Sequence, residues 1–298
     1  MYPPKFNYHR PGTLKEAVEL LSRYQDQEAK ILAGGQSLIP LLKLRMATPG
    51  LLIDINRIEE LCTMQERDGF VLFGALVRHA EIQESEWVRL RFPIMYDSAS
   101  QIGDVQVRNW GTLGGSVAHA DPAGDWAPVL IALNAAVGTI SARGERTVGI
   151  QDLLLDAYSP DLRPDEIVTQ IKVPLPAPRS GGAYVKLERR AGDFAVASVA
   201  VQLTLDEKSG CREIGIALGA VGSTALRAAR AEERLRNQEI VRELIESAAF
   251  QAASEADPFS DSRGSADYRR HVVKPLFQRA FDTAWRRARG EQVTTAHL

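Results

Sequence analysis

Two short stretches with paired glycines hold the most specific chemistry in this sequence. Residues 33–37 read Ala-Gly-Gly-Gln-Ser, and residues 112–116 read Thr-Leu-Gly-Gly-Ser. Because glycine has no Cβ, neighbouring glycines let backbone N–H groups approach a ligand closely, and concave rows of N–H groups bind anionic oxygens. Each stretch also has a hydroxyl group at its edge. Together they predict a ligand with two linked phosphates that is held from both sides.

Paired glycines are also common in tight turns, so the glycines alone leave a purely structural role open. Two features favour binding. Small polar residues close both stretches, and residues 106–124 form a long polar, glycine-rich segment. Such a segment predicts an irregular loop, and long irregular loops in compact domains are often functional. A valine at Gly35 or Gly114 should then displace the phosphates and leave the chain folded.

Two charged residues are further candidates for the same site. Asp125 directly precedes an apolar stretch at residues 126–133. It suits the N-cap of a helix and, equally, an acceptor for sugar hydroxyls. Lys186 lies in a predicted strand, where we expect it to be solvated because lysine is rarely buried.

The composition excludes several other classes of protein. The 298 residues carry a net charge of -2, and no run of 18 apolar residues occurs, so we expect no nucleic-acid partner and no membrane span. Two cysteines cannot ligate an iron–sulfur cluster, and the five histidines lack metal-ligand spacing, so we expect no metal in this chain. The common Gly-x-Gly-x-x-Gly dinucleotide turn is absent. Residues 1–5 lack the apolar core of a secretion signal, which favours the cytoplasm.

The elements that would position these residues follow from apolar periodicity. Thr13 and Glu16 form a capping-box pattern, so a helix should begin after Thr13. Strands are predicted at residues 29–32, 51–55, 70–75, 136–142, 166–173, 183–190, 197–205 and 213–221. Helices are predicted at residues 37–44, 81–89, 93–102, 125–133, 225–235, 239–256 and 267–289.

Three prolines within residues 174–178 indicate a domain boundary, because proline cannot continue a helix or a central strand. We therefore expect four parts. They are an N-terminal α/β subdomain at residues 1–57, a second α/β subdomain at 58–175, an antiparallel sheet with helices at 176–289, and a disordered tail at 290–298.

The glycine stretches and their surroundings resemble the FAD-binding medium subunits of the molybdenum hydroxylases, a group that includes carbon monoxide dehydrogenase and xanthine dehydrogenase. The resemblance rests first on residues 33–37 and 108–116, which match two linked motifs at the right separation. It runs over nearly the whole chain. Further matching segments are residues 6–11, 74–76, 121–125 and 189–194.

This resemblance implies an α+β protein. A two-part α/β FAD-binding domain of the vanillyl-alcohol-oxidase type would precede a C-terminal domain with a three-stranded antiparallel sheet and helices. FAD would be bound without covalent attachment, and no catalytic residue is implied. The implied cofactor-binding residues are Leu32, Ala33, Gly34, Gly35, Gln36, Ser37, Leu38, Ile102, Thr112, Leu113, Gly114, Gly115, Ser116, Asp125, Val168 and Lys186.

The resemblance also implies partners. A molybdopterin-binding large subunit and a small subunit with two 2Fe-2S clusters would form a dimer of heterotrimers with this cytoplasmic chain. Electrons would pass from the clusters to FAD and then to an external acceptor. Gln36 stands where carbon monoxide dehydrogenases have His, and Ser116 where xanthine dehydrogenases have Asn. The substrate therefore stays open among carbon monoxide, purines, N-heterocycles and aldehydes.

Two alternatives remain from the residues alone. A self-contained FAD-dependent oxidase or reductase would need a proton-transferring side chain, for which His79 and Tyr158 are candidates. A non-catalytic nucleotide-binding or assembly protein would have kept the fold without the cofactor. A flavin spectrum of the purified protein would exclude the second alternative.

Overall fold

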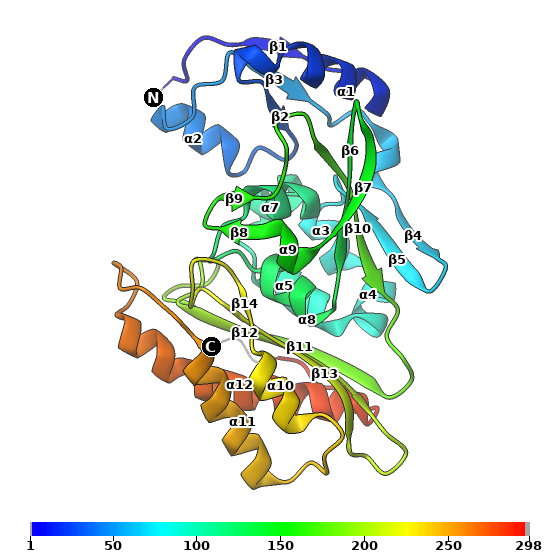
Figure 1. The fold of residues 1–298 in the computed structure, drawn as a ribbon, viewed down its shortest axis with the longest axis vertical. Helices are drawn as coiled ribbons and strands as arrows, with labels where there is room; N and C mark the ends of the chain where they lie inside the picture. Colours follow the sequence, from blue (N-terminus) through cyan, green and yellow to red (C-terminus); the bar gives the residue numbers. More distant parts are fainter. Residues whose placement is uncertain (1, 296–298) are drawn as a thin grey trace.

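The computed structural model describes residues 2–295, and three units follow one another along its long axis (Figure 1). The N-terminal unit contains a parallel three-stranded sheet with strand order β1-β3-β2. Leu32 at the end of β2 pairs with Asp54 at the end of β3. The carboxyl ends of these two strands, where the first glycine stretch begins, therefore meet at one edge. The helices and strands of this unit are β1 (Asn7–His9), α1 (Leu14–Arg23), β2 (Lys30–Leu32), α2 (Leu38–Leu44) and β3 (Leu51–Asp54).

Helix α1 begins where the capping pattern predicts. Thr13 Oγ1 accepts a hydrogen bond from the backbone N–H of Glu16 at 3.2 Å. The apolar face of the helix, with Ala17, Val18 and Leu21, is buried against the sheet. Short 3-10 turns at Gln25–Gln27 and Glu59–Cys62 complete the unit and its link to the next one.

The middle unit is an antiparallel five-stranded sheet with strand order β4-β5-β10-β6-β7, accompanied by short helices and a small hairpin, β8–β9. Strand β10 returns from far along the chain and lies between β5 and β6. The strands are β4 (Met64–Arg67), β5 (Phe70–Gly74), β6 (Ala136–Ser141), β7 (Gly144–Gly149), β8 (Leu154–Asp156), β9 (Ser159–Pro160) and β10 (Ile167–Pro174). The helices are α3 (His79–Glu84), α4 (Glu86–Arg91), α5 (Pro93–Gln101), α6 (Val105–Trp110), α7 (Leu113–His119), α8 (Trp126–Ala132) and α9 (Ile150–Leu153).

One expectation for this unit is wrong. Residues 106–124 do not form a long irregular loop, because α6 and α7 occupy most of them. Each helix is capped: Asp104 accepts from Val107 N at 2.8 Å, and Thr112 accepts from Gly115 N at 3.0 Å. These caps overcome the low helix propensity of the glycines. The second glycine stretch is thus the first turn of α7.

The C-terminal unit corrects the expected strand count. Its antiparallel sheet has four strands in the order β11-β12-β13-β14, whereas three were expected. The additional strand, β14, has only two residues, too few for any periodicity to show. The strands are β11 (Ser180–Leu187), β12 (Ala197–Leu205), β13 (Cys211–Gly219) and β14 (Leu226–Arg227), and the helices are α10 (Ala229–Leu235), α11 (Arg242–Glu255) and α12 (Ala266–Ala288).

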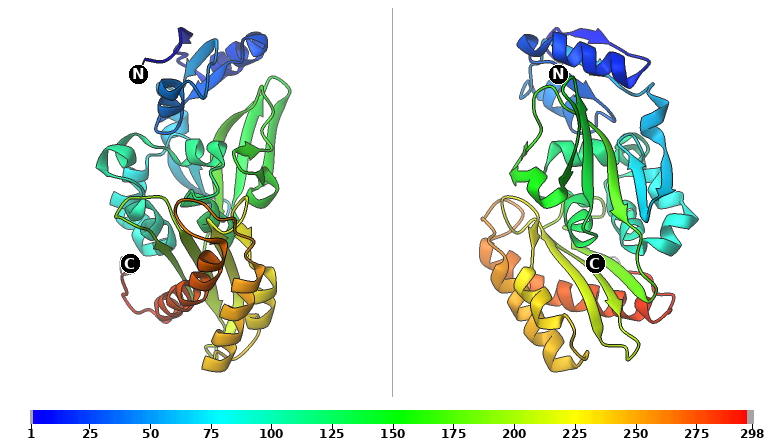
Figure 2. Two further views of the ribbon diagram at one scale, coloured as in Figure 1. Left: turned by 90° about the vertical axis from the view of Figure 1, so that its left-hand side faces the viewer. Right: turned by 45° about the vertical axis from the view of Figure 1, so that its right-hand side comes forward.

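The two faces of this sheet pack against different parts of the molecule. Val199 and Val201 on β12 belong to the core shared with α11 and α12, while Ala200 belongs to the core of the middle unit. On β11, Val185 and Tyr184 divide in the same way. The C-terminal helices therefore cover the face that is turned away from the middle unit (Figure 2).

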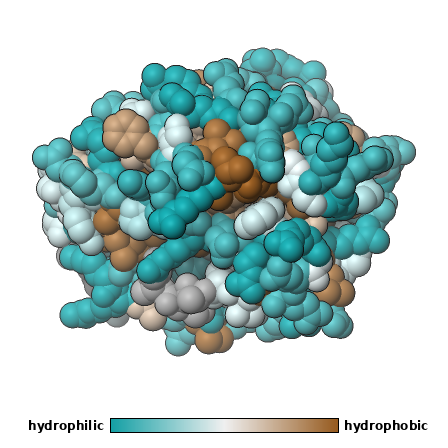
Figure 3. Space-filling model, turned by 90° about the horizontal axis from the view of Figure 1, so that it is seen from below, coloured by the Kyte–Doolittle hydropathy of each residue, from teal (hydrophilic) through white to brown (hydrophobic). Residues whose placement is uncertain are grey.

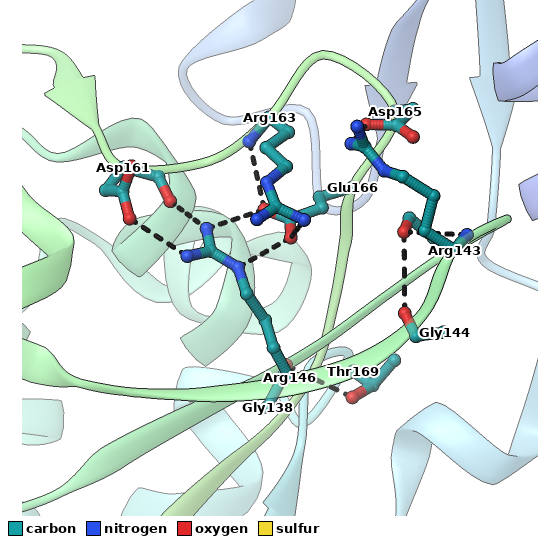
Figure 4. A network of polar contacts seen from close by, with 10 residues as sticks. Gly138, Arg143, Gly144, Arg146, Asp161, Arg163, Asp165, Glu166 and Thr169 are labelled. Carbon is teal, nitrogen blue, oxygen red and sulfur yellow. Dashed lines mark hydrogen bonds and ion pairs between the residues drawn. The ribbon is translucent and has the colours of Figure 1, made fainter.

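A network of charged residues secures the start of β10 (Figure 4). Arg146 on β7 donates to both carboxylate oxygens of Glu166, at 2.6 and 2.7 Å, and to Asp161 at 2.9 Å. Glu166 also accepts from the backbone N–H of Arg163 at 2.9 Å. This bidentate pairing fixes the segment that leads into Val168, two residues further on.

One end of the molecule, formed by the C-terminal unit, carries no large continuous apolar area (Figure 3). Viewed from the side of the C-terminal unit, it is mostly hydrophilic, with separate hydrophobic spots (Figure 3). No helix within residues 2–295 has both the length and the apolar character that crossing a membrane requires.

Of the expected tail, residues 296–298 lie outside the described residues. Thr295 donates to Asp97 at 2.9 Å.

Candidate functional site

The first glycine stretch lies between β2 and α2, and its backbone N–H groups do not take part in the hydrogen bonds of the described fold. None of the backbone N–H groups of residues 34–38 donates a hydrogen bond to another residue within 2–295. Gly35 has a positive φ of 75°, which turns the chain sharply before α2. Ser37 occupies the N-cap position without a capping hydrogen bond, so its hydroxyl is not used there. These donors match the expected anion cradle.

The second stretch has a different character, and the expectation of a second cradle of free N–H groups is wrong. Leu113 N donates to Val77 O at 2.9 Å, and Gly114 N donates to Ala75 O at 3.0 Å. Gly115 and Ser116 donate to the side chain and the carbonyl of Thr112. The backbone donors of residues 113–116 therefore serve the fold, and the stretch offers the Ser116 hydroxyl at its half-buried edge.

The glycines let backbone segments pack together. A Cβ on Gly34 would overlap the carbonyl oxygen of Trp110, two residues before the second stretch, and a Cβ on Gly115 would lie 3.7 Å from that of Ala33, so the two stretches are in direct contact. A Cβ on Gly114 would lie 2.5 Å from the Cβ of Ala75, inside the core. A valine at Gly114 would consequently disturb the fold itself. At Gly35, a Cβ would lie 2.6 Å from the Ile39 side chain, which can move, and not against backbone atoms.

Asp125 and Lys186 lie together in a buried polar network. Asp125 stands at the N-cap position of α8 without capping it. Its Oδ1 instead accepts from the hydroxyl of Tyr184 at 2.6 Å and lies 3.2 Å from Lys186 Nζ. The Asp125 side chain keeps 8% of its surface exposed. The N-cap interpretation is therefore wrong for this side chain, although the position along the helix is as expected.

The expectation that Lys186 is solvated is also wrong. Its ammonium group is fully buried and donates to the carbonyl oxygens of Gln101 at 2.7 Å and Asp193 at 3.0 Å. It also lies 3.1 Å from a carboxylate oxygen of Glu188. Lys186 is thus surrounded by oxygens from three segments. The alternation of β11 turns it toward the middle unit, beside Tyr184.

Burial governs the protonation of this network. Removal from water raises the pKa of Asp125, and the adjacent ammonium group of Lys186 opposes that rise. Burial and the carboxylate of Asp125 raise the pKa of the Tyr184 phenol well above its ordinary value. Tyr184 therefore remains a hydrogen-bond donor at neutral pH.

The remaining expected site residues are spread over several elements. Leu32 ends β2, and Leu38 begins α2, both half-buried. Leu113 is fully buried in the core of the middle unit. Ile102 follows α5, and Val168 lies on β10 with 7% of its surface exposed.

The two candidate proton-transferring residues lie in unlike surroundings. His79 is buried behind the second stretch, where its Nδ1 accepts from the indole N–H of Trp126 at 3.1 Å. Burial lowers the pKa of His79 to about 3, so the ring is neutral. Tyr158 is exposed, and its ring lies 5.1 Å from that of His119. The geometry does not bring His79 and Tyr158 together as an acid–base pair.

Sequence reasoning missed two polar residues at this site. Asn56 Nδ2 donates to the carbonyl oxygen of Ala33 at 2.7 Å, and its Oδ1 accepts from Arg78 at 2.6 Å. Arg78 also donates to the carbonyl oxygen of Trp110. An available signal was the position of Asn56 just after the predicted strand at 51–55, at the same sheet edge as the first stretch.

Comparison with known proteins agrees with this architecture. Residues 4–176 match the family described as FAD binding domain in molybdopterin dehydrogenase, and residues 182–284 match the CO dehydrogenase flavoprotein C-terminal domain. The two matches meet near the proline-rich segment.

Relatives of similar length support the same grouping. The chain is 38% identical to the 6-hydroxypseudooxynicotine dehydrogenase complex subunit alpha of Paenarthrobacter nicotinovorans, over 100% of both chains. It is 41% identical to the glyceraldehyde dehydrogenase medium chain of Sulfolobus acidocaldarius, over 94% of this chain and 99% of the relative. Its fold matches a chain in the structure of carbon monoxide dehydrogenase from Hydrogenophaga pseudoflava with a TM-score of 0.93 and 40% identity, over 96% and 99% of the two chains.

Proposed function

Because this chain belongs to the FAD-binding medium subunits of the molybdenum hydroxylases, we propose that residues 33–37 and 112–116 hold the diphosphate of FAD between them. The first stretch contributes backbone N–H groups, and the second contributes the hydroxyl of Ser116. Leu32, Leu38 and the other expected site residues on neighbouring elements would then surround the rest of the cofactor.

The chain is the FAD-binding electron-transfer subunit of a molybdenum hydroxylase complex, an oxidoreductase. The molybdenum cofactor and the 2Fe-2S clusters are carried by partner subunits. FAD supplies the redox chemistry by which electrons from those clusters reach an external acceptor. The residues of this chain bind and orient the cofactor and control its surroundings.

The single observation that carries the site assignment is the row of unused N–H groups at residues 34–38. Buried or half-buried backbone donors are nearly always paired in proteins. Residues 34–38 present five consecutive donors that have no acceptor within residues 2–295, and all of these residues except the exposed Gln36 are half-buried. At the edge where β2 and β3 end, they therefore suit an anionic ligand. A diphosphate presents enough oxygens to use most of them.

We propose different roles for Asp125 and Lys186: Asp125 binds the cofactor, and Lys186 positions Asp125. Tyr184 and Lys186 both address Oδ1 of Asp125, which leaves Oδ2 for a hydroxyl of the cofactor. Lys186 already lies beside four oxygens, so we assign it to holding Asp125 in place. Ile102 and Val168 offer apolar surface that would pack on the flavin ring.

We further propose a dimer of heterotrimers in the cytoplasm. The two cysteines, Cys62 and Cys211, are both free, as is usual in a reducing compartment. The relatives named above carry names with different substrates, at similar identity to this chain. Substrate choice therefore belongs to the large subunit and not to this one.

The proposed site is tested by titrating the cofactor-free chain with FAD, FMN and riboflavin. If the diphosphate is the main contact, FAD should bind far more tightly than FMN, which has a single phosphate, and riboflavin should bind weakest. Equal affinities for FAD and riboflavin would contradict the assignment. Iron and molybdenum should co-purify with the chain when it is isolated from its own host.

A further inference from the structure

The structure assigns a positioning role to Asn56 and Arg78: together they form a bracket that sets the separation of the two glycine stretches and so prepares the chain for FAD. This inference rests on the function proposed above. Neither residue belongs to either glycine stretch. Asn56 reaches the first stretch through a side-chain hydrogen bond. Arg78 meets the second stretch through its backbone at Thr112, and its side chain bonds to Trp110, two residues before that stretch.

Asn56 holds the first stretch. Its Nδ2 donates to the carbonyl oxygen of Ala33 at 2.7 Å. The side chain is itself oriented by Asp54, whose Oδ1 accepts from both the backbone N–H and Nδ2 of Asn56, at 2.9 and 2.7 Å. The hydroxyl of Tyr8 donates to the other oxygen of Asp54 at 2.5 Å. Asn56 is therefore fixed to strands β1 and β3 of the N-terminal unit.

Arg78 holds the second stretch. Its backbone forms an isolated antiparallel bridge with Thr112. One terminal nitrogen of its guanidinium donates to Trp110 O, and the other donates to Asn56 Oδ1 at 2.6 Å. The guanidinium carbon also lies 5.9 Å from the centre of the Trp110 ring. Because the guanidinium is planar, one side chain sets both bonds at a fixed spacing.

The bracket supplies the polar links between the stretches. Among residues 2–295, no backbone hydrogen bond links residues 33–38 to residues 110–116. Their direct contacts are the close approach of Gly34 to Trp110 O and that of Gly115 to Ala33, where a Cβ on Gly115 would lie 3.7 Å from the Cβ of Ala33. The first stretch belongs to the N-terminal unit and the second to the middle unit. The two units also share a hydrophobic core, to which Ile53 contributes from β3 and Leu76 and Ile167 from the middle unit. Without Asn56 and Arg78, the units would stay joined, but the two stretches would lose the hydrogen bonds that set their separation, which a ligand held by both would then have to fix on binding.

A simple attraction between Arg78 and the negative diphosphate is the competing explanation, and the charge-preserving variant separates the two. Arg78→Lys keeps the positive charge but has a single nitrogen, which cannot serve Trp110 O and Asn56 Oδ1 with the same geometry. The bracket predicts that Arg78→Lys loses FAD affinity as Arg78→Gln does. Charge attraction predicts that Arg78→Lys binds like the unaltered chain.

The experiment measures FAD dissociation constants for the full chain and four variants: Asn56→Ala, Arg78→Gln, Arg78→Lys and the double variant Asn56→Ala/Arg78→Gln. Each single change should weaken binding about tenfold, the value of one well-placed hydrogen bond. The double variant should bind no more weakly than the weaker single one, since both changes break the same bracket. Additive losses would overturn the proposal, as would unchanged affinities.

Arg91→Gln is the matched control. Arg91 also lies over a tryptophan ring, 5.6 Å from the centre of Trp87, and also donates to one side chain, Glu66. It touches neither glycine stretch. Its removal should leave FAD affinity unchanged, and an equal loss there would show that the effect of Arg78 is not specific to its place.

A second measurement needs no cofactor. Spin labels at the exposed positions Gln36→Cys and Asn109→Cys, in a Cys62→Ser background, report the distance between the stretches in the FAD-free chain. Asn56→Ala should broaden this distance distribution, and an unchanged distribution would overturn the bracket. If the distribution broadens but the unaltered chain binds no FAD, the bracket stands and the proposed function fails.

Discussion

The two glycine stretches look alike in sequence, yet they do opposite things with their backbone N–H groups. In the first stretch, the N–H groups of residues 34–38 have no acceptor within the described chain. In the second, the N–H groups of residues 113–116 all donate to neighbouring segments or to the helix cap. The first stretch leaves its donors without an acceptor within residues 2–295, and the second uses its donors in hydrogen bonds within the fold.

The difference comes from where each stretch enters its helix. Ser37 is the N-cap residue of α2 and makes no capping hydrogen bond, at the edge where β2 and β3 end. Thr112 begins α7 with a full cap, and Gly114 presses into the segment after β5. Paired glycines therefore mark close approach in general. Whether the approaching partner is a ligand or another backbone depends on the tertiary surroundings.

The largest expected effect is that of Gly114→Val. The new side chain would collide with the Cβ and backbone of Ala75, and overpacking of this kind costs about 3 kcal/mol of unfolding free energy. Urea unfolding of the FAD-free chain measures it. Gly12→Val, at a position with nothing within 4 Å, serves as the control. A normally stable Gly114→Val chain would show that the second stretch is open, like the first.

Gly35→Val should act mainly on the ligand. Valine is strained at a φ of +75°, so the chain would leave its turn and the donors of residues 34–38 would no longer converge. We expect about tenfold weaker FAD binding or more, from a strain of about 1–2 kcal/mol. Gly69→Val is matched, because Gly69 has a φ of +79° in the open turn between β4 and β5. An equal loss of FAD affinity in both variants would show that the effect of Gly35→Val does not depend on its place in the first glycine stretch.

A smaller pair of changes compares the two helix starts directly. Thr112→Val removes the cap of α7 and should cost about 1 kcal/mol of unfolding free energy, with little direct effect on FAD contacts. Ser37→Ala should change the stability of the FAD-free chain by less than about 0.5 kcal/mol but weaken FAD binding. Thermal unfolding measures the stability of each variant, and FAD titration measures its affinity for the cofactor. The reverse pattern would assign the ligand to the second stretch.

The smallest effect is a pH dependence at the base of the first stretch. Burial alone would raise the pKa of Asp54, but hydrogen bonds from Tyr8 and Asn56 outweigh it and lower the pKa below its ordinary value. The ionised form is thus favoured by folding. This stabilisation is present above the unfolded-state pKa of about 3.9 and is lost as the pH falls through the folded pKa.

Asp54→Asn cannot titrate, so the stability advantage of the unaltered chain over this variant should shrink as the pH is lowered from about 5 to about 3. Urea midpoints across that range measure it. A constant difference between the two proteins would show that Asp54 does not titrate with a lowered pKa.

Much of the local structure was predictable because it depends on neighbours in sequence. The capping pattern at Thr13 placed the start of α1, and strict alternation placed strand β12 at residues 197–205. The two-residue strand β14 and the helices α6 and α7 were missed. A pair of residues shows no period, and glycine in a helix contradicts propensity until its caps and tertiary contacts are known.

The polar network was the least predictable part. Lysine on a strand is normally solvated, and only the packing of the C-terminal sheet against the middle unit encloses Lys186 among carboxylate and carbonyl oxygens. The partners Asp125 and Gln101 are 61 and 85 residues away along the chain. No local pattern encodes such a pairing.

The sequence by itself determined the family and the two places where the backbone must come close to another group, because motif spacing and missing side chains are local properties. Tertiary structure decided what that group is. It set Gly34 against Trp110, used the donors of the second stretch within the fold and left those of the first without an acceptor among residues 2–295. The reason is physical: a hydrogen bond or a close contact depends on distance in space, and two of the four acceptors of the second stretch, Val77 O and Ala75 O, come from a segment remote in sequence.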